Sequence, residues 1–167
     1  MPAMLHRPVI DGFEFAAAGS RLSGEWPVSD FPRLRDVLHS GRGTLRYELQ
    51  GVPELQGRPG LRLQVTGTLD LTCQRCLEAL EQPLQIDALL LLYAGERDFA
   101  AIPVEADGPD RIVGAKDMAV HDLIEEEVLL AIPYAPRHEY CEAGRREEIA
   151  ARQKPFAGLR SLLDAKH

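Results

Sequence analysis

The clearest pattern of hydrophobic and polar positions lies in residues 61–71. The odd-numbered positions are apolar or glycine, and the even-numbered positions between them are polar or charged. This period-two alternation is typical of an antiparallel strand that buries one face and exposes the other. Cys73 continues the apolar series where the strand is expected to end. The pattern therefore predicts that Cys73 points toward the core.

Weaker patterns before and after this strand predict further strands. Residues 44–49 alternate in the same way, and residues 21–28 alternate until Pro27, which suits an edge strand. Residues 84–93 are apolar enough for a strand buried on both sides that pairs back across a turn at residues 73–76. We also expect a short strand at residues 13–18 and a turn-rich connection at residues 51–60.

Helical spacing of apolar residues occurs at two places. Residues 117–131 carry an apolar stripe, with Asp117 as the expected N-cap and Pro133 just beyond the end. A shorter helix is expected after Asp30, with Pro32 in its first turn. The strands and helices together predict an α+β fold: an antiparallel sheet, open or barrel-like, with a C-terminal helix packed on it.

The chain of 167 residues is 45% hydrophobic, which is sufficient for one domain with one core. We expect residues 1–167 to form a single domain, in which residues 95–114 are a mobile acidic loop and residues 143–167 a loosely attached helical tail. No apolar run approaches the roughly 20 residues of a membrane-spanning helix, so no membrane association is expected. Three cysteines, two of them three positions apart, suit reduced thiols in the cytoplasm rather than a disulfide framework.

The net charge of −7 is unevenly distributed along the chain. Residues 1–76 sum to +1 and residues 77–167 to −8. An acidic half is a poor match for the phosphates of nucleic acid but suits a basic protein partner or a solvated face. The consecutive residues Glu125, Glu126 and Glu127 cannot converge on one point from a helix, so they predict a solvated or protein-docking face rather than a catalytic site.

Cys73-Gln-Arg-Cys76 is the sharpest chemical motif, and His138 and Cys141 follow it 62 and 65 residues after Cys76. Three interpretations remain open. The four residues could bind one structural zinc ion. The cysteines could be ordinary reduced thiols at a strand end. Cys73 and Cys76 could be the redox pair of a thiol oxidoreductase, although such pairs begin a helix after a parallel strand and no such pattern surrounds them here.

Other enzymatic signatures are missing from the sequence. It contains no glycine-rich phosphate loop, no nucleophile elbow and no pair of histidines at helical spacing. We therefore expect neither an enzyme nor a small-molecule substrate.

Four segments in order resemble the YceD family of large ribosomal RNA subunit accumulation proteins. They are an alternating strand leading into Cys-x-Arg-Cys (65–77), an acidic helix ending in proline (122–133), a Pro/His/Cys segment (133–141) and a Pro-Phe-Ala signature (155–162). The spacer between His138 and Cys141 is shorter than in many relatives.

The resemblance implies a non-catalytic ribosome biogenesis factor that supports synthesis, processing or stability of 23S rRNA. Its partner would be a pre-50S particle, a basic ribosomal protein or a 23S rRNA precursor. Two alternatives to this ribosomal role remain: a zinc-stabilised protein-interaction module unrelated to ribosomes, and a thiol oxidoreductase that uses Cys73 and Cys76. The residues we expect to contact RNA or a protein partner are Arg42, Arg46, Arg58, Arg62, Arg75, Glu125, Glu126 and Glu127.

Overall fold

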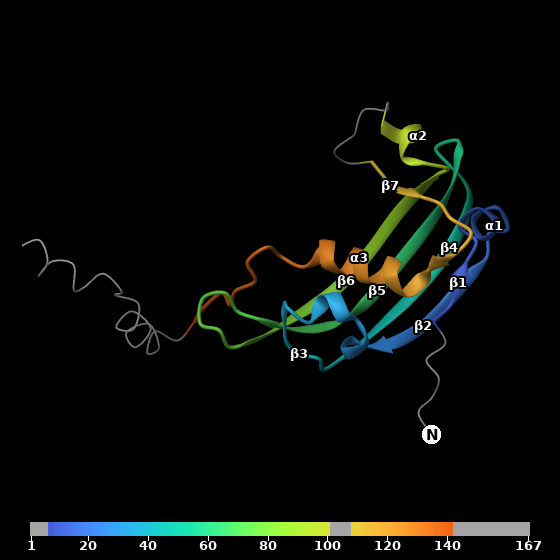
Figure 1. The fold of residues 1–167 in the computed structure, drawn as a ribbon. Helices are drawn as coiled ribbons and strands as arrows, with labels where there is room; N and C mark the ends of the chain where they lie inside the picture. The colour runs from blue at the N-terminus through green and yellow to red at the C-terminus, as the bar shows by residue number, and fades with distance from the viewer. Residues whose placement is uncertain (1–6, 101–107, 142–167) are drawn as a thin grey trace, which may run out of the picture.

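A twisted sheet crossed by one helix makes up most of the molecule, as a computed structural model shows (Figure 1). The structure describes residues 7–100 and 108–141, so the expected tail at 143–167 lies outside the described residues. In chain order, the elements are β1 (Val9–Ile10), α1 (Gly12–Ala17), β2 (Arg21–Pro27), the 3-10 turns η1 (Val28–Asp30) and η2 (Pro32–Leu34), β3 (Leu38–Ser40), β4 (Thr44–Leu55), β5 (Arg58–Thr72), β6 (Ala79–Tyr93), α2 (Glu96–Ala100), β7 (Asp110–Val113), β8 (Met118–Ala119) and α3 (Val120–Ala131).

The main sheet has the strand order β2-β4-β5-β6-β7, with β3 pairing beside β5. All pairs are antiparallel except β6 with β7. Within the described residues the sheet stays open, with β2 and β7 at its edges, so the barrel-like alternative is not what forms. β1 and β8 make a separate two-stranded sheet. The α+β class and the edge position of β2 are confirmed.

β4, β5 and β6 follow the alternation of the sequence, but they are longer than it predicts. Their inward residues, including Leu49, Leu63 and Leu90, are fully buried. The expected turn-rich connection at 51–60 is wrong, because β4 continues to Leu55 and β5 begins at Arg58. Gln56 and Gly57 close this hairpin with φ values of 53° and 78°. Two consecutive residues with positive φ match the twist of the strands they join.

α3 packs across one face of the sheet and completes the core. Val120, Ile124 and Val128 are fully buried against sheet residues such as Leu61 and Leu92. The burial of three α3 residues at helical spacing confirms the predicted stripe. No helix in residues 7–100 or 108–141 is long and apolar enough to cross a membrane.

Local hydrogen bonds explain where the sequence prediction failed. Residues 13–18 belong mostly to helix α1 rather than a strand, because the Asp11 carboxylate accepts hydrogen bonds from the N–H groups of Phe13 and Glu14. α3 begins at Val120 and not at Asp117, because Met118 and Ala119 pair with β1 instead.

Two further segments also differ from their expected form. The helix expected after Asp30 is only a pair of 3-10 turns, after which residues 38–40 pair with β5 as β3. In the acidic segment 95–114, α2 and β7 are regular elements, and residues 101–107 lie outside the described residues. β7 pairs in parallel with the end of β6, with Ile112 opposite Leu92. Mobility of this segment stays a prediction.

Candidate metal site and the surface around it

The Cys73–Cys76 motif forms the turn between β5 and β6. Thr72 and Ala79 are the last paired residues of the two strands. The Cys73 N–H donates to the carbonyl of Glu78 at 2.9 Å, and the Leu77 N–H donates to the carbonyl of Cys73 at 2.9 Å. Leu77 adopts a φ of 63°, which L-residues rarely take. The turn is therefore tightly folded, and it holds Cys76 close to the buried thiol of Cys73.

A segment from the end of the described chain packs onto this turn. Residues 132–141 continue from the end of α3 to the β5–β6 turn, as Figure 1 shows. The Gln74 N–H donates to the carbonyl of Pro136 at 2.8 Å. The ring Nε2 of His138 lies 2.9 Å from the carbonyl oxygen of Ala79. These two bonds bring His138 and Cys141 to the cysteines of the turn, as the zinc interpretation requires.

The four potential ligand atoms converge on one point. They all lie within 4.8 Å of one another. The Sγ atoms of Cys73 and Cys141 are 3.8 Å apart, and His138 Nδ1 lies 3.4 Å from Cys76 Sγ and 3.9 Å from Cys141 Sγ. A tetrahedral zinc ion bound at about 2.3 Å by sulfur and about 2.0 Å by nitrogen places its ligand atoms about 3.5–3.8 Å apart. The cluster therefore fits a single tetrahedral metal ion.

The hydrogen-bonding environment prepares the histidine and the turn for such an ion. A carbonyl oxygen can only accept, so His138 Nε2 carries the hydrogen and Nδ1 presents its lone pair to the thiols. The Arg75 N–H points at Cys73 Sγ at 3.5 Å. Burial alone would raise the pKa of the Cys73 thiol, but N–H groups of Cys76, His138 and Arg75 lower that pKa to about 5. The sulfur of Cys73 is thus held in an environment that favours the thiolate, the form that binds metals.

Cys141 experiences the opposite effect. Burial and its hydrogen bonds to Cys73 and Cys76 raise the pKa of the Cys141 thiol. Neighbouring thiolates repel a further negative charge, and a bound cation would remove that repulsion. The donor set of three sulfurs and one imidazole is that of a structural zinc site, in which all four positions are filled by protein.

The geometry does not resemble a redox pair. Cys73 and Cys76 lie between two antiparallel strands, and neither residue begins a helix. Cys73 is completely buried, so a disulfide substrate cannot reach its sulfur from solvent. The distinguishing feature of a reactive dithiol, an accessible thiolate at a helix N-terminus, is not formed by these residues.

The arginines expected to contact RNA or a protein partner are not gathered in one place. Arg46 and Arg62 extend from the outward faces of β4 and β5, where each forms an ion pair, with Glu25 at 3.5 Å and with Asp87 at 2.6 Å. Arg58, at the start of β5, lies 4.5 Å from the ring centre of Tyr93. Arg42, after β3, and Arg75, in the cysteine turn, are exposed at the other end of the sheet. Arg42, Arg46, Arg58 and Arg62 therefore do not form one continuous surface, and their contact with RNA or a partner stays a prediction.

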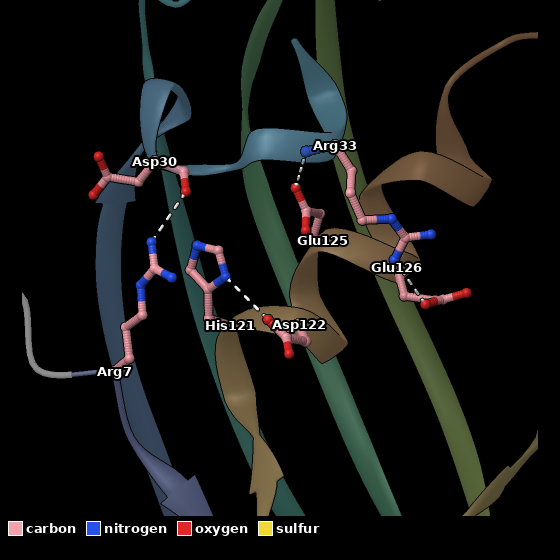
Figure 2. A network of polar contacts seen from close by, with 7 residues as sticks. All are labelled: Arg7, Asp30, Arg33, His121, Asp122, Glu125 and Glu126. Carbon is pink, nitrogen blue, oxygen red and sulfur yellow. Dashed lines mark hydrogen bonds and ion pairs between the residues drawn. The ribbon is translucent and has the colours of Figure 1, made fainter. Parts of the chain in front are cut away.

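Two of the three consecutive glutamates of α3 are buried rather than solvated, and Figure 2 shows the contacts of Glu125 and Glu126 with Arg33. Glu125 is 3% exposed, and its carboxylate accepts the backbone N–H of Arg33 at 2.7 Å. Glu127 is also buried, and only Glu126 reaches the surface, where it pairs with the Arg33 guanidinium at 3.1 Å. The interpretation of all three glutamates as a solvated or docking face is wrong for Glu125 and Glu127, because both are buried.

His121 also lies in this region. It is buried and stacks on Phe31 with ring centres 4.4 Å apart, and its Nδ1 lies 3.5 Å from the Asp122 carboxylate. His121, Asp122 and Glu125 form a second group of potential ligands. Because one Glu125 oxygen already accepts the Arg33 N–H, this group is better described as a tie between η2 and α3.

Comparison with known proteins gives a consistent result. A sequence model of the family described as "Large ribosomal RNA subunit accumulation protein YceD" matches residues 61–163. A protein of Haemophilus influenzae with the same description is 30% identical over 149 residues, which are 83% of this chain and 85% of the relative. No solved structure matches the chain. The matched region contains β5, β6, α3 and all four residues of the metal cluster.

Proposed function

The chain belongs to the YceD family, and from this premise we propose that it is a cytoplasmic, non-catalytic ribosome biogenesis factor that supports accumulation of 23S rRNA. The family description refers to RNA of the large ribosomal subunit, and the relative in Haemophilus influenzae carries the same description. The single observation that supports a role for this chain is the match over residues 61–163, which includes both halves of the cysteine site.

A structural zinc ion is the second part of the proposal. Cys73, Cys76, His138 and Cys141 would fill its four positions, so no position is left for substrate or water. The ion would fix the segment after α3 to the β5–β6 turn. This arrangement supports a binding surface rather than a catalytic centre, because it stabilises two loops and exposes no reactive group.

We propose that the acidic surface of α3 and β7 binds a basic partner, a ribosomal protein of a pre-50S particle. Among the exposed residues, Asp122 and Glu126 of α3 and Asp110 of β7 carry negative charge. Such charges favour encounter with a basic protein and raise the association rate.

Co-sedimentation tests the proposed association. A tagged form of the chain is expressed in a bacterial strain that lacks its own family member, and the lysate is separated on a sucrose gradient. We expect the protein in fractions that contain precursors of the large subunit. Protein that stays at the top of the gradient at low salt would contradict the ribosomal role and would favour an interaction module with another function.

Treatment of the same lysate with RNase separates the two kinds of contact. Protein released by RNase is held mainly by RNA, whereas protein that remains with ribosomal proteins is held mainly by protein contacts. A disulfide-exchange assay with Cys73→Ser as its control addresses the oxidoreductase alternative. Turnover that disappears in this variant would contradict a non-catalytic role.

A further inference from the structure

Two tyrosines next to the metal cluster are exposed in a way that packing does not explain. Tyr134 is fully exposed, and Tyr140 is 86% exposed. Both belong to the segment that carries His138 and Cys141. By contrast, Trp26, Phe31 and Tyr47 are buried in the core. Exposed aromatic rings held by a rigid support are typical of binding surfaces.

Exposed arginines without an acidic partner occur in the segments that meet at this end of the sheet. Arg75 lies in the cysteine turn, Arg137 precedes His138, and Arg35 and Arg42 flank β3. All four side chains are exposed, and none forms an ion pair with another residue that the structure describes. They differ in this respect from Arg46 and Arg62, whose charges are neutralised on the outer face of the sheet.

A small cavity next to β3 provides a third feature. Its volume is about 240 Å³, and it is lined by Ser29, Arg35, Leu38, His39, Ser40 and Gly41. The Ser40 hydroxyl donates to Asp70 at 2.5 Å and is therefore already engaged. The groups left to meet a ligand are the Arg35 guanidinium, the His39 ring and the Ser29 hydroxyl, all of which can donate hydrogen bonds to a phosphate.

Three segments of the chain, residues 29–43, 72–78 and 133–141, place these features at one end of the sheet, which we name the cysteine end (Figure 1). β3 pairs with the last residues of β5, with Ser40 opposite Asp70, only three residues before Cys73. The bond from the Gln74 N–H to the Pro136 carbonyl connects the other two segments.

The cysteine end is also the part of the molecule that best tolerates a polyanion. Its three segments contain five arginines and four acidic residues, whereas the whole chain has a net charge of −7. The acidic residues are Asp30, Asp36, Glu78 and Glu139. The remainder of the chain is therefore strongly acidic, and a nucleic acid would approach from the cysteine end.

We propose that the cysteine end binds unpaired RNA, with bases stacked on Tyr134 and Tyr140 and a phosphate held beside Arg35 and His39. Sequence-independent RNA contacts combine aromatic rings for the bases with cations for the phosphates, and both are present here. This inference rests on the proposed function and deepens it, because it selects RNA as the partner of this surface and single-stranded segments as its target.

Fluorescence anisotropy with a labelled single-stranded RNA oligonucleotide tests the proposal on the purified, metal-loaded chain. Loss of one stacked base costs about 1–3 kcal/mol, so Tyr134→Ala and Tyr140→Ala should each weaken binding about fivefold or more. Tyr134→Phe and Tyr140→Phe keep the ring and should bind within about twofold of the wild type. Metal content and circular dichroism of the four variants should be unchanged, since both rings are exposed.

The arginines provide a matched electrostatic comparison. Arg35→Ala should weaken binding and reduce the slope of log affinity against log salt by about 0.7, the value of one phosphate contact on a single strand. Arg46→Ala removes an equal charge from the outer face, where Glu25 neutralises it, and should leave the affinity almost unchanged. The same RNA annealed to its complement should bind more weakly, because its bases cannot stack on the tyrosines.

Either of two results would overturn the proposal. One is affinity within twofold of the wild type for both tyrosine-to-alanine variants, and the other is an equal loss in Arg35→Ala and Arg46→Ala. In the first case, loss of binding to a ribosomal protein in the same tyrosine variants would identify the cysteine end as a protein interface. In any of these cases, normal 23S rRNA accumulation with the wild-type chain would leave the proposed function intact. Failure of the RNA-binding proposal is therefore distinguishable from failure of the proposed function.

Discussion

At the scale of single residues, the position of one hydrogen atom matters to the metal site. The Nε2–H of His138 is directed to the carbonyl of Ala79, so only Nδ1 can face the three thiols. The sequence predicted all four residues of the cluster from their types and spacing. It could not show that the spacer between His138 and Cys141 is long enough, because that depends on the bond from Gln74 to Pro136 that positions the segment.

We expect purified protein to contain about one zinc ion per chain, and Cys76→Ser to lose it. The free energy of unfolding of this variant should fall by at least about 2 kcal/mol, because two loops lose their common anchor. Gln74→Ala is the matched control in the same turn, since its backbone N–H remains and its side chain only contacts the carbonyl of Thr72. Metal analysis and urea denaturation measure both effects. Wild-type protein free of metal after purification without chelators would contradict the zinc assignment.

Glu127 provides a prediction about pH. Burial, and then the charges of Asp110 and Glu126, raise the pKa of its carboxyl group. A raised carboxyl pKa means that the folded state binds the proton more tightly than the unfolded state, so the group costs stability at high pH and the cost vanishes at low pH. Glu127→Gln should therefore increase the free energy of unfolding at about pH 7.5 by up to about 1 kcal/mol, and by less at about pH 5.5.

Urea denaturation at the two pH values checks the Glu127 prediction. Glu54→Gln, at an exposed position, is the control and should change stability little at either pH. A gain for Glu127→Gln that is larger at the lower pH would show that the sign of the effect is wrong.

At the scale of elements, long alternating strands were predictable and short elements were not. The pattern of β5 determines which residues face the core over its whole length, because a shift of one residue would expose every leucine. α1, β3 and the 3-10 turns are too short to show periodicity. α1 depends on its N-cap Asp11, and β3 depends on pairing with the distant residue Leu71. The sequence likewise could not show that Glu125 is buried, because its partner Arg33 is 92 residues away.

The tie between η2 and α3 yields a paired prediction. Glu125→Ala leaves the partly buried N–H of Arg33 without its acceptor and should lower the free energy of unfolding by about 1–3 kcal/mol. Glu126→Ala, next to it, removes an exposed ion pair with the same arginine and should cost less than about 1 kcal/mol. Chemical denaturation of both variants measures the difference. Equal losses of unfolding free energy in the two variants would contradict the prediction that the buried Glu125 contact stabilises the fold more than the exposed Glu126 ion pair.

At the scale of the whole molecule, the cysteine site connects the β5–β6 turn in the middle of the chain to the segment that follows α3. β5 and β6 belong to the sheet, and the segment after α3 returns to their turn, so the site depends on the complete fold. The zinc interpretation of the sequence required this connection, and the structure brings the two segments together. The distribution of cations could not be predicted, because ion pairs such as Arg62 with Asp87 form only between folded strands.

The most direct test of the central claim is the ratio of 23S to 16S rRNA in a bacterial strain that lacks its own family member. We predict that expression of the wild-type chain raises this ratio toward normal, and that Cys76→Ser, at equal protein level, does not. Gln74→Ala should restore the ratio as well as the wild type. An unchanged ratio with the wild-type chain, expressed at normal levels, would contradict the proposed role in accumulation of large-subunit rRNA.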